Sequence, residues 1–414
     1  MATVSPTLSA VPGSPRDDAR IIALVGSAHG ISHFSQLLLA PLFPWLKDAF
    51  AVSYAQLGLL MTIFFVVSCA VQTGSGFIVD RIGPRPVLFA GLGLLGLAAF
   101  GYAASPSYAM LAAFSVVGGL GNGVFHPVDY TLLNRKVHAT RLGHAFSVHG
   151  VTGSLGWALA PALLVPLAIA YSWRVALVAA GTLAFAVLAL LWFQRGPLHL
   201  EAVPVPARPD AAAPRRGEGF DFLRIPAVWM CFAFFFFYAI ALSGVQAFAP
   251  EAARLLHDVP RSTIAACLTV YMVASACGMI AGGFLASDPA RCERIVGIGF
   301  GAAAAIALTL GFASFPAALV PVLFGAMGFC AGIAGPSRDL LVKRSAPENA
   351  TGRVYGVVYS GLDIGQAIAP LAFGTMMDLG HPSLVWLGIA GVQLALIGSA
   401  LRIRKVRRTV LAAA

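Results

Sequence analysis

Long apolar runs recur along the whole chain, and short polar segments separate them. A run of about twenty apolar residues is the length that a helix needs to cross the hydrocarbon core of a bilayer. A closed barrel would instead need short segments of alternating polarity, and this pattern shows none. We therefore predict membrane-spanning helices near residues 21–41, 54–79, 86–104, 109–133, 143–168, 173–194, 225–249, 262–286, 295–313, 316–341, 354–377 and 383–403.

One polar segment is longer than the other connections and divides the predicted helices into two groups of six. Its sequence is rich in Pro, Ala and charge, which is typical of a flexible linker. The first twenty residues lack the charged start, apolar centre and cleavage site of a secretory signal. The pattern predicts an all-α membrane protein with a cytoplasmic tail (1–20), a six-helix bundle (21–194), a cytoplasmic linker (195–224), a second six-helix bundle (225–403) and a cytoplasmic tail (404–414).

The composition agrees with burial in lipid. Hydrophobic residues make up 58% of the chain, charged residues make up 11%, and the mean hydropathy is +0.83. A soluble domain carries about 25% charged residues. The chain therefore has too few charges to cover a water-facing surface of this size.

The net charge is +10, and the basic residues are distributed unequally between the two sides of the membrane. This distribution argues against a nucleic-acid partner. If the N-terminus is cytoplasmic, all but four of the 27 Lys and Arg residues fall in cytoplasmic loops, tails or adjoining helix ends. The four on the outer side are Lys47, Arg174, Arg254 and Arg261. This excess predicts a multi-pass protein of the bacterial inner membrane with both termini cytoplasmic. The basic run 402–408 is expected to lie near anionic lipid.

The two halves match one another at a constant offset of 209 residues. Pro and Gly mark kinks and close helix contacts, so their shared placement predicts a shared backbone shape. Two such repeats, related by an axis along the membrane normal, are a known plan for transporters, with the site at their interface. The matched positions are Ala40-Pro41 with Ala249-Pro250, Pro127 with Pro336, Arg135 with Arg344, Gly143 with Gly352, Gly156 with Gly365, and Ala160-Pro161 with Ala369-Pro370.

The loop after the second predicted helix reads Gly76-Phe-Ile-Val-Asp80-Arg81-Ile-Gly83-Pro84-Arg85. It resembles the G-x-x-x-D-R-x-G-x-R signature of the major facilitator superfamily. Gly76 allows close helix approach, Asp80 can meet an arginine or a helix N-terminus, and Gly83 permits a tight turn. Such a cluster can latch the cytoplasmic face through charge pairs that break on opening, whereas the alternative is a basic loop that serves topology only. The predicted cytoplasmic gate comprises Gly76, Asp80, Arg81, Gly83, Arg85, Asp129, Arg338 and Asp339.

A second resemblance covers most of the first half and thins in the second. Its motifs are Val124-Phe125-His126-Pro127, Gly143-x-Ala145-x-Ser147, Gly153-x-x-Gly156-x-x-x-Ala160-Pro161, and the first helix from His33-Phe34 through Pro41-Leu-Phe-Pro44 to Ser53-Tyr54-Ala55-Gln56. Together they are similar to the fosmidomycin resistance protein family, whose members are regarded as proton-driven exporters of drugs. The chain departs from that family at Val128, which precedes Asp129, and at Ala160.

Ionisable and polar side chains at membrane depth are costly, and they are therefore candidate functional groups. The spacing of His29, His33 and Gln36 puts them on one helix face, and Asn122, His126 and Asp129 repeat that spacing. The superfamily resemblance implies that the first, fourth, seventh and tenth helices line a central cavity. Each candidate has a structural alternative, which is a hydrogen bond that only bridges two helices. The predicted substrate-binding or proton-coupling residues are His29, His33, Gln36, Asn122, His126, His149, Tyr238, Gln246, Tyr359 and Asp363.

These features favour a secondary active transporter that moves a small organic solute against coupled protons. The chain has no phosphate-cradling GxxxxGK loop, and we expect no cofactor, no metal, no enzymatic activity and a monomeric state. His titrates near neutral pH and Asp can be shifted there, which suits proton coupling. The resemblance implies export of a drug or metabolite. The alternatives are import of a small organic anion such as a carboxylate, and a transporter-like sensor that binds without transport.

Overall fold

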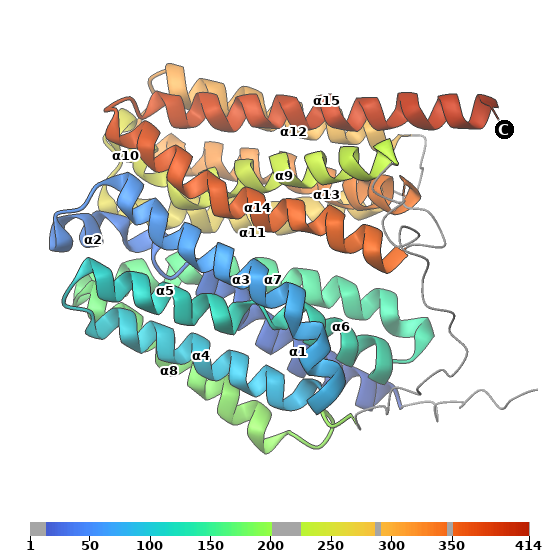
Figure 1. Ribbon diagram of the computed structural model, residues 1–414. Helices are drawn as coiled ribbons and strands as arrows, with labels where there is room; N and C mark the ends of the chain where they lie inside the picture. Colours follow the sequence, from blue (N-terminus) through green and yellow to red (C-terminus); the bar gives the residue numbers. More distant parts are fainter. Residues whose placement is uncertain (1–13, 201–224, 286–290, 346–350, 414) are drawn as a thin grey trace, which may run out of the picture.

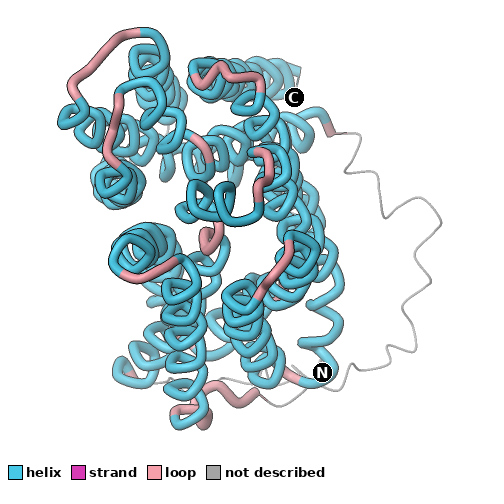
Figure 2. Tube along the Cα trace, turned by 90° about the vertical axis from the view of Figure 1, so that its left-hand side faces the viewer, coloured by secondary structure: helices cyan, strands magenta, loops and turns pink. Residues whose placement is uncertain are grey.

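The computed structural model describes residues 14–200, 225–285, 291–345 and 351–413. Side chains are described over the same ranges except 227, 338–345, 351–359 and 400–413. Within these ranges the chain forms helices and no β-strand (Figure 2). Most of the predicted linker, residues 201–224, lies outside the described part of the chain, as do the first 13 residues and residue 414.

The first half consists of eight α-helices and two short 3-10 helices. They are α1 (Pro15–Gln36), η1 (Ala40–Leu42), α2 (Phe43–Phe50), α3 (Tyr54–Ile82), α4 (Pro84–Ala104), α5 (Tyr108–Asn122), α6 (Phe125–Lys136), η2 (Ala139–Arg141), α7 (Leu142–Ala170) and α8 (Trp173–Phe193). Within residues 195–200, which we predicted as the start of the linker, Leu198 is fully buried.

The second half repeats this plan with α9 (Pro226–Ala247), α10 (Ala249–His257), α11 (Arg261–Leu285), α12 (Cys292–Phe312), η4 (Ala317–Leu319), α13 (Val320–Ser345), α14 (Thr351–Asp378) and α15 (Ser383–Ala413). Helices of each half pack mainly on one another, and the two halves meet chiefly where α3 lies along α14 and α7 lies along α11 (Figure 1).

Ten helical segments of the described chain are long and apolar enough to cross a membrane. The last two predicted spans coincide with α14 and α15, which are not among these ten; the apolar described part of α15 is Ser383–Ser399. The all-helical, multi-pass membrane fold is thus confirmed. The count of twelve spans stays a prediction.

Helix starts follow from local capping signals. Ser53 caps α3 through a reciprocal capping box with Gln56, and Ser107 and Ser172 cap α5 and α8 through their side-chain oxygens. Gly83 joins α3 to α4 with a φ of 83°, a conformation that favours glycine, as the tight turn predicted there requires.

The internal repeat has a direct structural counterpart in helix packing. A Cβ added at Gly156 of α7 would overlap the carbonyl oxygen of Gly30 in α1. A Cβ added at Gly365 of α14 would lie 2.7 Å from the Cβ of Ala239 in α9. Because residues 30 and 239 are also 209 apart, the same small-residue contact occurs at the same register in both halves.

Candidate functional site

A break in the fourth predicted span sets the geometry of the site. We expected one helix over 109–133, and the structure has α5 and α6 with a break at Gly123 and Val124. Pro127 has no N–H to donate to the carbonyl of Gly123, four residues earlier. Ser75 instead donates a 3.4 Å side-chain hydrogen bond to that carbonyl. Because of the break, α6 begins in an orientation in which the face that carries His126 and Asp129 is directed toward α1 and α7.

Asp129 lies at the centre of a buried histidine cluster. Its Oδ2 atom is 3.0 Å from Nδ1 of His29 and 3.1 Å from Nε2 of His149. The two imidazole rings stack with centroids 3.5 Å apart. Asp129 is fully buried, and the exposed fractions of His29 and His149 are 2% and 6%. Three helices, α1, α6 and α7, thus converge on one carboxylate.

The surroundings of Asp129 differ from those expected of a gate residue. We grouped it with the cytoplasmic gate because it lies toward a cytoplasmic helix end. In the structure it faces the interior of the first half and pairs with two of the predicted coupling residues. The break between α5 and α6, which periodicity did not reveal, brings it there.

His33 and His126 complete the histidine cluster around His29. Their ring centroids lie 4.3 Å and 5.6 Å from that of His29, respectively. His33 also packs on the indole of Trp157 at 4.2 Å, and its buried Nδ1 atom has no hydrogen-bond partner in the described structure. A Cβ at Gly153 would approach His33 and His29 to 3.0 Å or less. Glycine at this position of α7 therefore makes room for the rings.

A neutral polar group extends the cluster along α1. Ser32 donates to Oδ1 of Asn122 at 2.8 Å, and Gln36 donates to the same atom at 3.3 Å. Asn122 in turn donates to Ser68 at 2.8 Å, and Trp157 donates to Gln36 at 3.0 Å. The predicted residues Gln36 and Asn122 therefore join α1 to α3, α5 and α7.

A second line of hydrogen bonds crosses from the first half to the second. His126 Nδ1 lies 2.8 Å from Oε1 of Gln72 on α3, and Nε2 of Gln72 donates a 2.9 Å bond to Oδ2 of Asp363 on α14. The amide of Gln72 can serve both neighbours because it carries one acceptor and two donors. Cys69 also lies against the Asp363 carboxylate. Sequence reasoning missed Gln72, although a polar residue within the second predicted span is itself a signal.

The remaining candidates have other surroundings. Tyr238, on α9, packs edge-on against Phe300 of α12. Gln246 is buried near the end of α9, and its Nε2 atom has no hydrogen-bond partner among the described residues. The side chains of Tyr359, Arg338 and Asp339 lie outside the described residues.

The charged centre of the signature loop is exposed in this structure, whereas Gly83 and Pro84 are buried. Asp80 and Arg81 are exposed and form no ion pair with another described residue. A Cβ at Gly76 would have no atom within 4 Å, so the close approach that we expected there does not occur. The close approach on α3 is instead at Gly58, whose position faces the carbonyl oxygen of Pro370 on α14.

At the opposite end of α3 the two halves are held together by polar contacts that the sequence did not reveal. Asp378 accepts 2.8 Å bonds from the backbone N–H groups of Tyr54 and Ala55, so an α14 carboxylate caps the start of α3. The Tyr54 hydroxyl donates a 2.9 Å bond to Glu251 of α10. Hydrogen bonds from Arg254 also reach Glu251 and raise the pKa of this guanidinium.

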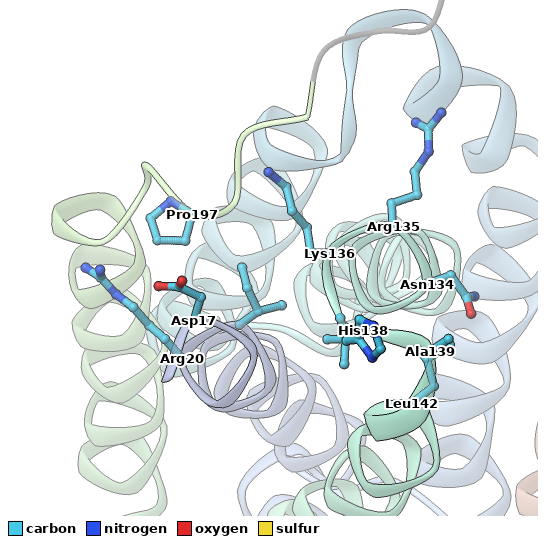
Figure 3. Close-up of a pocket in the computed structure, with 11 residues that line it drawn as sticks. Asp17, Arg20, Asn134, Arg135, Lys136, His138, Ala139, Leu142 and Pro197 are labelled. Carbon is cyan, nitrogen blue, oxygen red and sulfur yellow. The ribbon is translucent and has the colours of Figure 1, made fainter. Parts of the chain in front are cut away.

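An open pocket of about 620 Å³ lies elsewhere, at the end of the first half where α1 begins and α6 ends (Figure 3). Its ionisable lining residues are Asp17, Arg20, Arg135, Lys136 and His138. His29 lies nine positions after Arg20 on α1, a rise of about 13.5 Å along the helix axis. The pocket is therefore distinct from the histidine cluster.

Comparison with known proteins supports the transporter fold. The chain is 26% identical over 351 residues to the probable nitrate/nitrite transporter NarK2 of Mycobacterium tuberculosis (strain ATCC 25618 / H37Rv), covering 82% of this chain and 85% of that protein. It is 30% identical over 152 residues to the uncharacterized MFS-type transporter YfnC of Bacillus subtilis (strain 168). That match spans 36% of this chain and 37% of YfnC.

The resemblance to the fosmidomycin resistance protein is a partial match. The chain is 30% identical to that protein of Escherichia coli (strain K12) over 152 residues, which cover 34% of this chain and 35% of the relative. Among solved structures, a bacterial homolog to the human lysosomal transporter Spinster, in an inward-facing and occupied conformation, shares the fold. Its TM-score is 0.72 at 15% identity, over 97% of this chain and 99% of that chain.

A family profile described as Major Facilitator Superfamily matches residues 25–370 and 253–410, which together span most of the chain. The repeat packing, the helical membrane fold and the signature loop agree with this match. The chain therefore belongs to the Major Facilitator Superfamily, a family of transporters.

Proposed function

We propose that the chain is a proton-coupled secondary transporter that exports a small organic solute, a drug or metabolite, by alternating access. In this proposal it crosses the bacterial inner membrane twelve times with both termini cytoplasmic, and functions as a monomer. The asymmetry of Lys and Arg supports the orientation. The partial match to the fosmidomycin resistance protein supports export.

The observation that carries the proposal is the hydrogen-bond line from His126 through Gln72 to Asp363. This line connects His126 of the first half with Asp363 of the second half, and both groups are side chains of helices that we predict to cross the membrane. A carboxylate in apolar surroundings must be protonated, paired or solvated. Movement of α14 away from α3 would break the bond from Gln72, so the proton affinity of Asp363 depends on the arrangement of the halves. A dependence of this kind is what couples a proton gradient to a conformational cycle.

The distribution of contacts between the halves supports an inward-open state. Polar contacts gather at the end that carries Tyr54 and Asp378, which is the outer end in the proposed orientation. Phe43 and Phe248 also pack there, with ring centroids 5.5 Å apart. At the other end of α3, Phe77 is 74% exposed, and Asp80 and Arg81 of the signature loop form no ion pair with another described residue. A latch that breaks on cytoplasmic opening accounts for both features.

A second candidate is proton-coupled import of a small anion. One specific observation favours it: the match to a probable nitrate/nitrite transporter extends over 82% of this chain, far beyond the partial match to the fosmidomycin resistance protein. Imidazoles in a cavity can also bind carboxylates or other anions by donating hydrogen bonds.

Reconstitution tests the proposal. Compounds that raise the melting temperature of the purified protein, drawn from drugs and organic acids, identify candidate substrates. In proteoliposomes with an internal pH dye, such a compound should cause proton movement that Asp363→Asn abolishes. Accumulation in everted but not right-side-out vesicles indicates export, and the reverse indicates import. Substrate movement without any proton movement in the wild type would overturn the coupling proposal.

A further inference from the structure

We propose that His29, Asp129 and His149 form a binding site for a divalent transition-metal ion of the zinc type, inside the first half of the molecule. This site goes beyond the proposed transport function and does not depend on it. Three observations carry it: the spacing of the ligand atoms, a buried carboxylate that no described Lys or Arg pairs with, and the chemistry of the three side chains.

The ligand atoms already have nearly the spacing of a coordination shell. Tetrahedral zinc binds His nitrogen and carboxylate oxygen at about 2.0–2.2 Å, which separates neighbouring ligand atoms by about 3.3 Å. Here two nitrogens, Nδ1 of His29 and Nε2 of His149, lie 3.0 and 3.1 Å from Oδ2 of Asp129. All three ligand atoms lie within 4.8 Å of one another. Small outward shifts of the rings are enough to admit an ion.

The electrostatics of Asp129 also call for a cation. The side chain is fully buried, and its two hydrogen-bond partners are imidazoles. No Lys or Arg pairs with it in the described part of the chain, and its Oδ1 atom has no partner there. A buried carboxylate whose charge is not compensated is strongly destabilising. A divalent ion at Oδ2 would supply the missing positive charge.

The ligand set suits zinc-type ions more than calcium or magnesium. Two imidazole nitrogens and one carboxylate oxygen are typical of Zn²⁺, Co²⁺ or Ni²⁺, whereas Ca²⁺ and Mg²⁺ prefer oxygen ligands. Binding requires each coordinating nitrogen to be deprotonated, so both hydrogen bonds to Oδ2 are replaced by metal bonds and protons are released or moved to the other ring nitrogens. Three protein ligands leave one position open for water or an anion.

A second triad shares His29. His29, His33 and His126 also bring possible ligand atoms within 4.8 Å of one another. We assign the ion to the triad with Asp129 because all three of its side chains are buried and one of them is anionic. His33 and His126 then line the neighbouring space, where the unpartnered Nδ1 atom of His33 can receive a proton displaced from His29.

The site lies within one half of the molecule. Its three ligands come from α1, α6 and α7, and none comes from the helices that the second half contributes. Metal binding is therefore measurable on the purified full-length protein without a substrate, a gradient or reconstitution. Failure of metal binding and failure of proton-coupled transport are consequently separate results.

The test is a Co²⁺ titration of tag-free protein in detergent, followed by absorption of the ligand-field bands and by displacement with Zn²⁺. We expect saturation at one ion per chain and a rise in melting temperature with Zn²⁺. Asp129→Asn and His149→Gln should each weaken binding more than about tenfold. His144→Gln is the matched control, because His144 is exposed on the same helix, α7. It should bind like the wild type.

Two outcomes would overturn the proposal. One is the absence of saturable Co²⁺ binding by the wild-type protein, which is decisive even if the variants fold poorly. The other is binding that survives in folded His149→Gln protein but is lost in His144→Gln, because the ion would then occupy the surface.

Discussion

Gln72 of α3 donates a 2.9 Å hydrogen bond to Asp363 of α14 while its carbonyl oxygen lies 2.8 Å from His126 Nδ1. The two ends of this amide therefore contact ionisable groups from different halves of the molecule. A primary amide does not titrate. Gln72 can therefore couple the protonation of Asp363 to that of His126 only through its orientation and its hydrogen bonds. This makes the Asp363 carboxylate the group whose protonation is tied most directly to the contact between α3 and α14.

Asp363→Asn should abolish gradient-driven accumulation of substrate while retaining exchange. Asparagine mimics the protonated carboxyl permanently, and exchange requires no net proton movement. Transport into proteoliposomes, with and without a pH gradient and with and without internal substrate, measures the two activities. Thr62→Val is a suitable control, because Thr62 also bonds across to α14, donating 2.6 Å to the carbonyl of Ala367, but does not titrate.

If His126 carries the proton instead, His126→Gln should show the exchange-only pattern, and Asp363→Asn should only lower the melting temperature. Unchanged accumulation and an unchanged pH profile in both variants would assign coupling to other residues.

Asp378→Ala and Asp80→Asn should shift the conformational equilibrium in opposite directions. Loss of the carboxylate that caps α3 removes about 0.5–2 kcal/mol from the contact at the proposed outer end and favours outward opening. Asp80→Asn weakens a latch that forms only when the cytoplasmic face closes, and so favours the present arrangement. The distance between spin labels at positions 82 and 284, both exposed and near the cytoplasmic end in the proposed orientation, should shorten in Asp378→Ala and lengthen in Asp80→Asn. A population in Asp80→Asn equal to that of the wild type would mean that the signature loop serves topology alone.

Labelling of single cysteines should find residues 201–224 and both termini on the cytoplasmic side. The prediction rests on the four outer Lys and Arg residues out of 27. In a cysteine-free background, a membrane-impermeant maleimide should react at position 210 only in everted vesicles. Position 48, in α2, is the matched control and should react only in right-side-out vesicles, since Asp48 is exposed at the opposite end. Reaction of position 210 from outside the cell would reverse the proposed orientation.

The sequence predicted the fold well because its main signals are local. These signals are the length of the apolar runs, the polar segment near residue 200 and the 209-residue offset between the halves. They depend on few long-range contacts. The site was predicted in part. Helical spacing grouped His29 with His33, but it could not show that Asp129 turns inward, since that depends on the break that Gly123 and Pro127 produce.

The hydrogen bonds between the two halves could not be predicted from the sequence for another physical reason. The bond from Gln72 to Asp363 joins residues 291 positions apart, and the cap of α3 by Asp378 joins residues more than 320 apart. The periodicity of the sequence around Gln72 or Asp378 does not indicate which distant residue each of them contacts. Gly76 shows the converse: the motif suggested a close helix contact, but a Cβ at this position would have no atom within 4 Å.

Gly58→Ala should disfavour the present arrangement of α3 and α14, whereas Gly74→Ala on the same helix should not. A Cβ at position 58 would overlap the carbonyl oxygen of Pro370, which belongs to rigid helix backbone, while a Cβ at position 74 has no atom within 4 Å. Overpacking of this kind costs about 1–3 kcal/mol, but replacing an unobstructed helical glycine with alanine stabilises a helix by about 1 kcal/mol. The two variants should therefore move the melting temperature in opposite directions, Gly58→Ala downward and Gly74→Ala upward or not at all. Spin labels at positions 82 and 284, near the cytoplasmic ends of α3 and α11 in the proposed orientation, should move closer together if Gly58→Ala escapes the clash by separating the halves at their outer end. Equal melting temperatures for the two variants would mean that α3 and α14 do not approach this closely in solution.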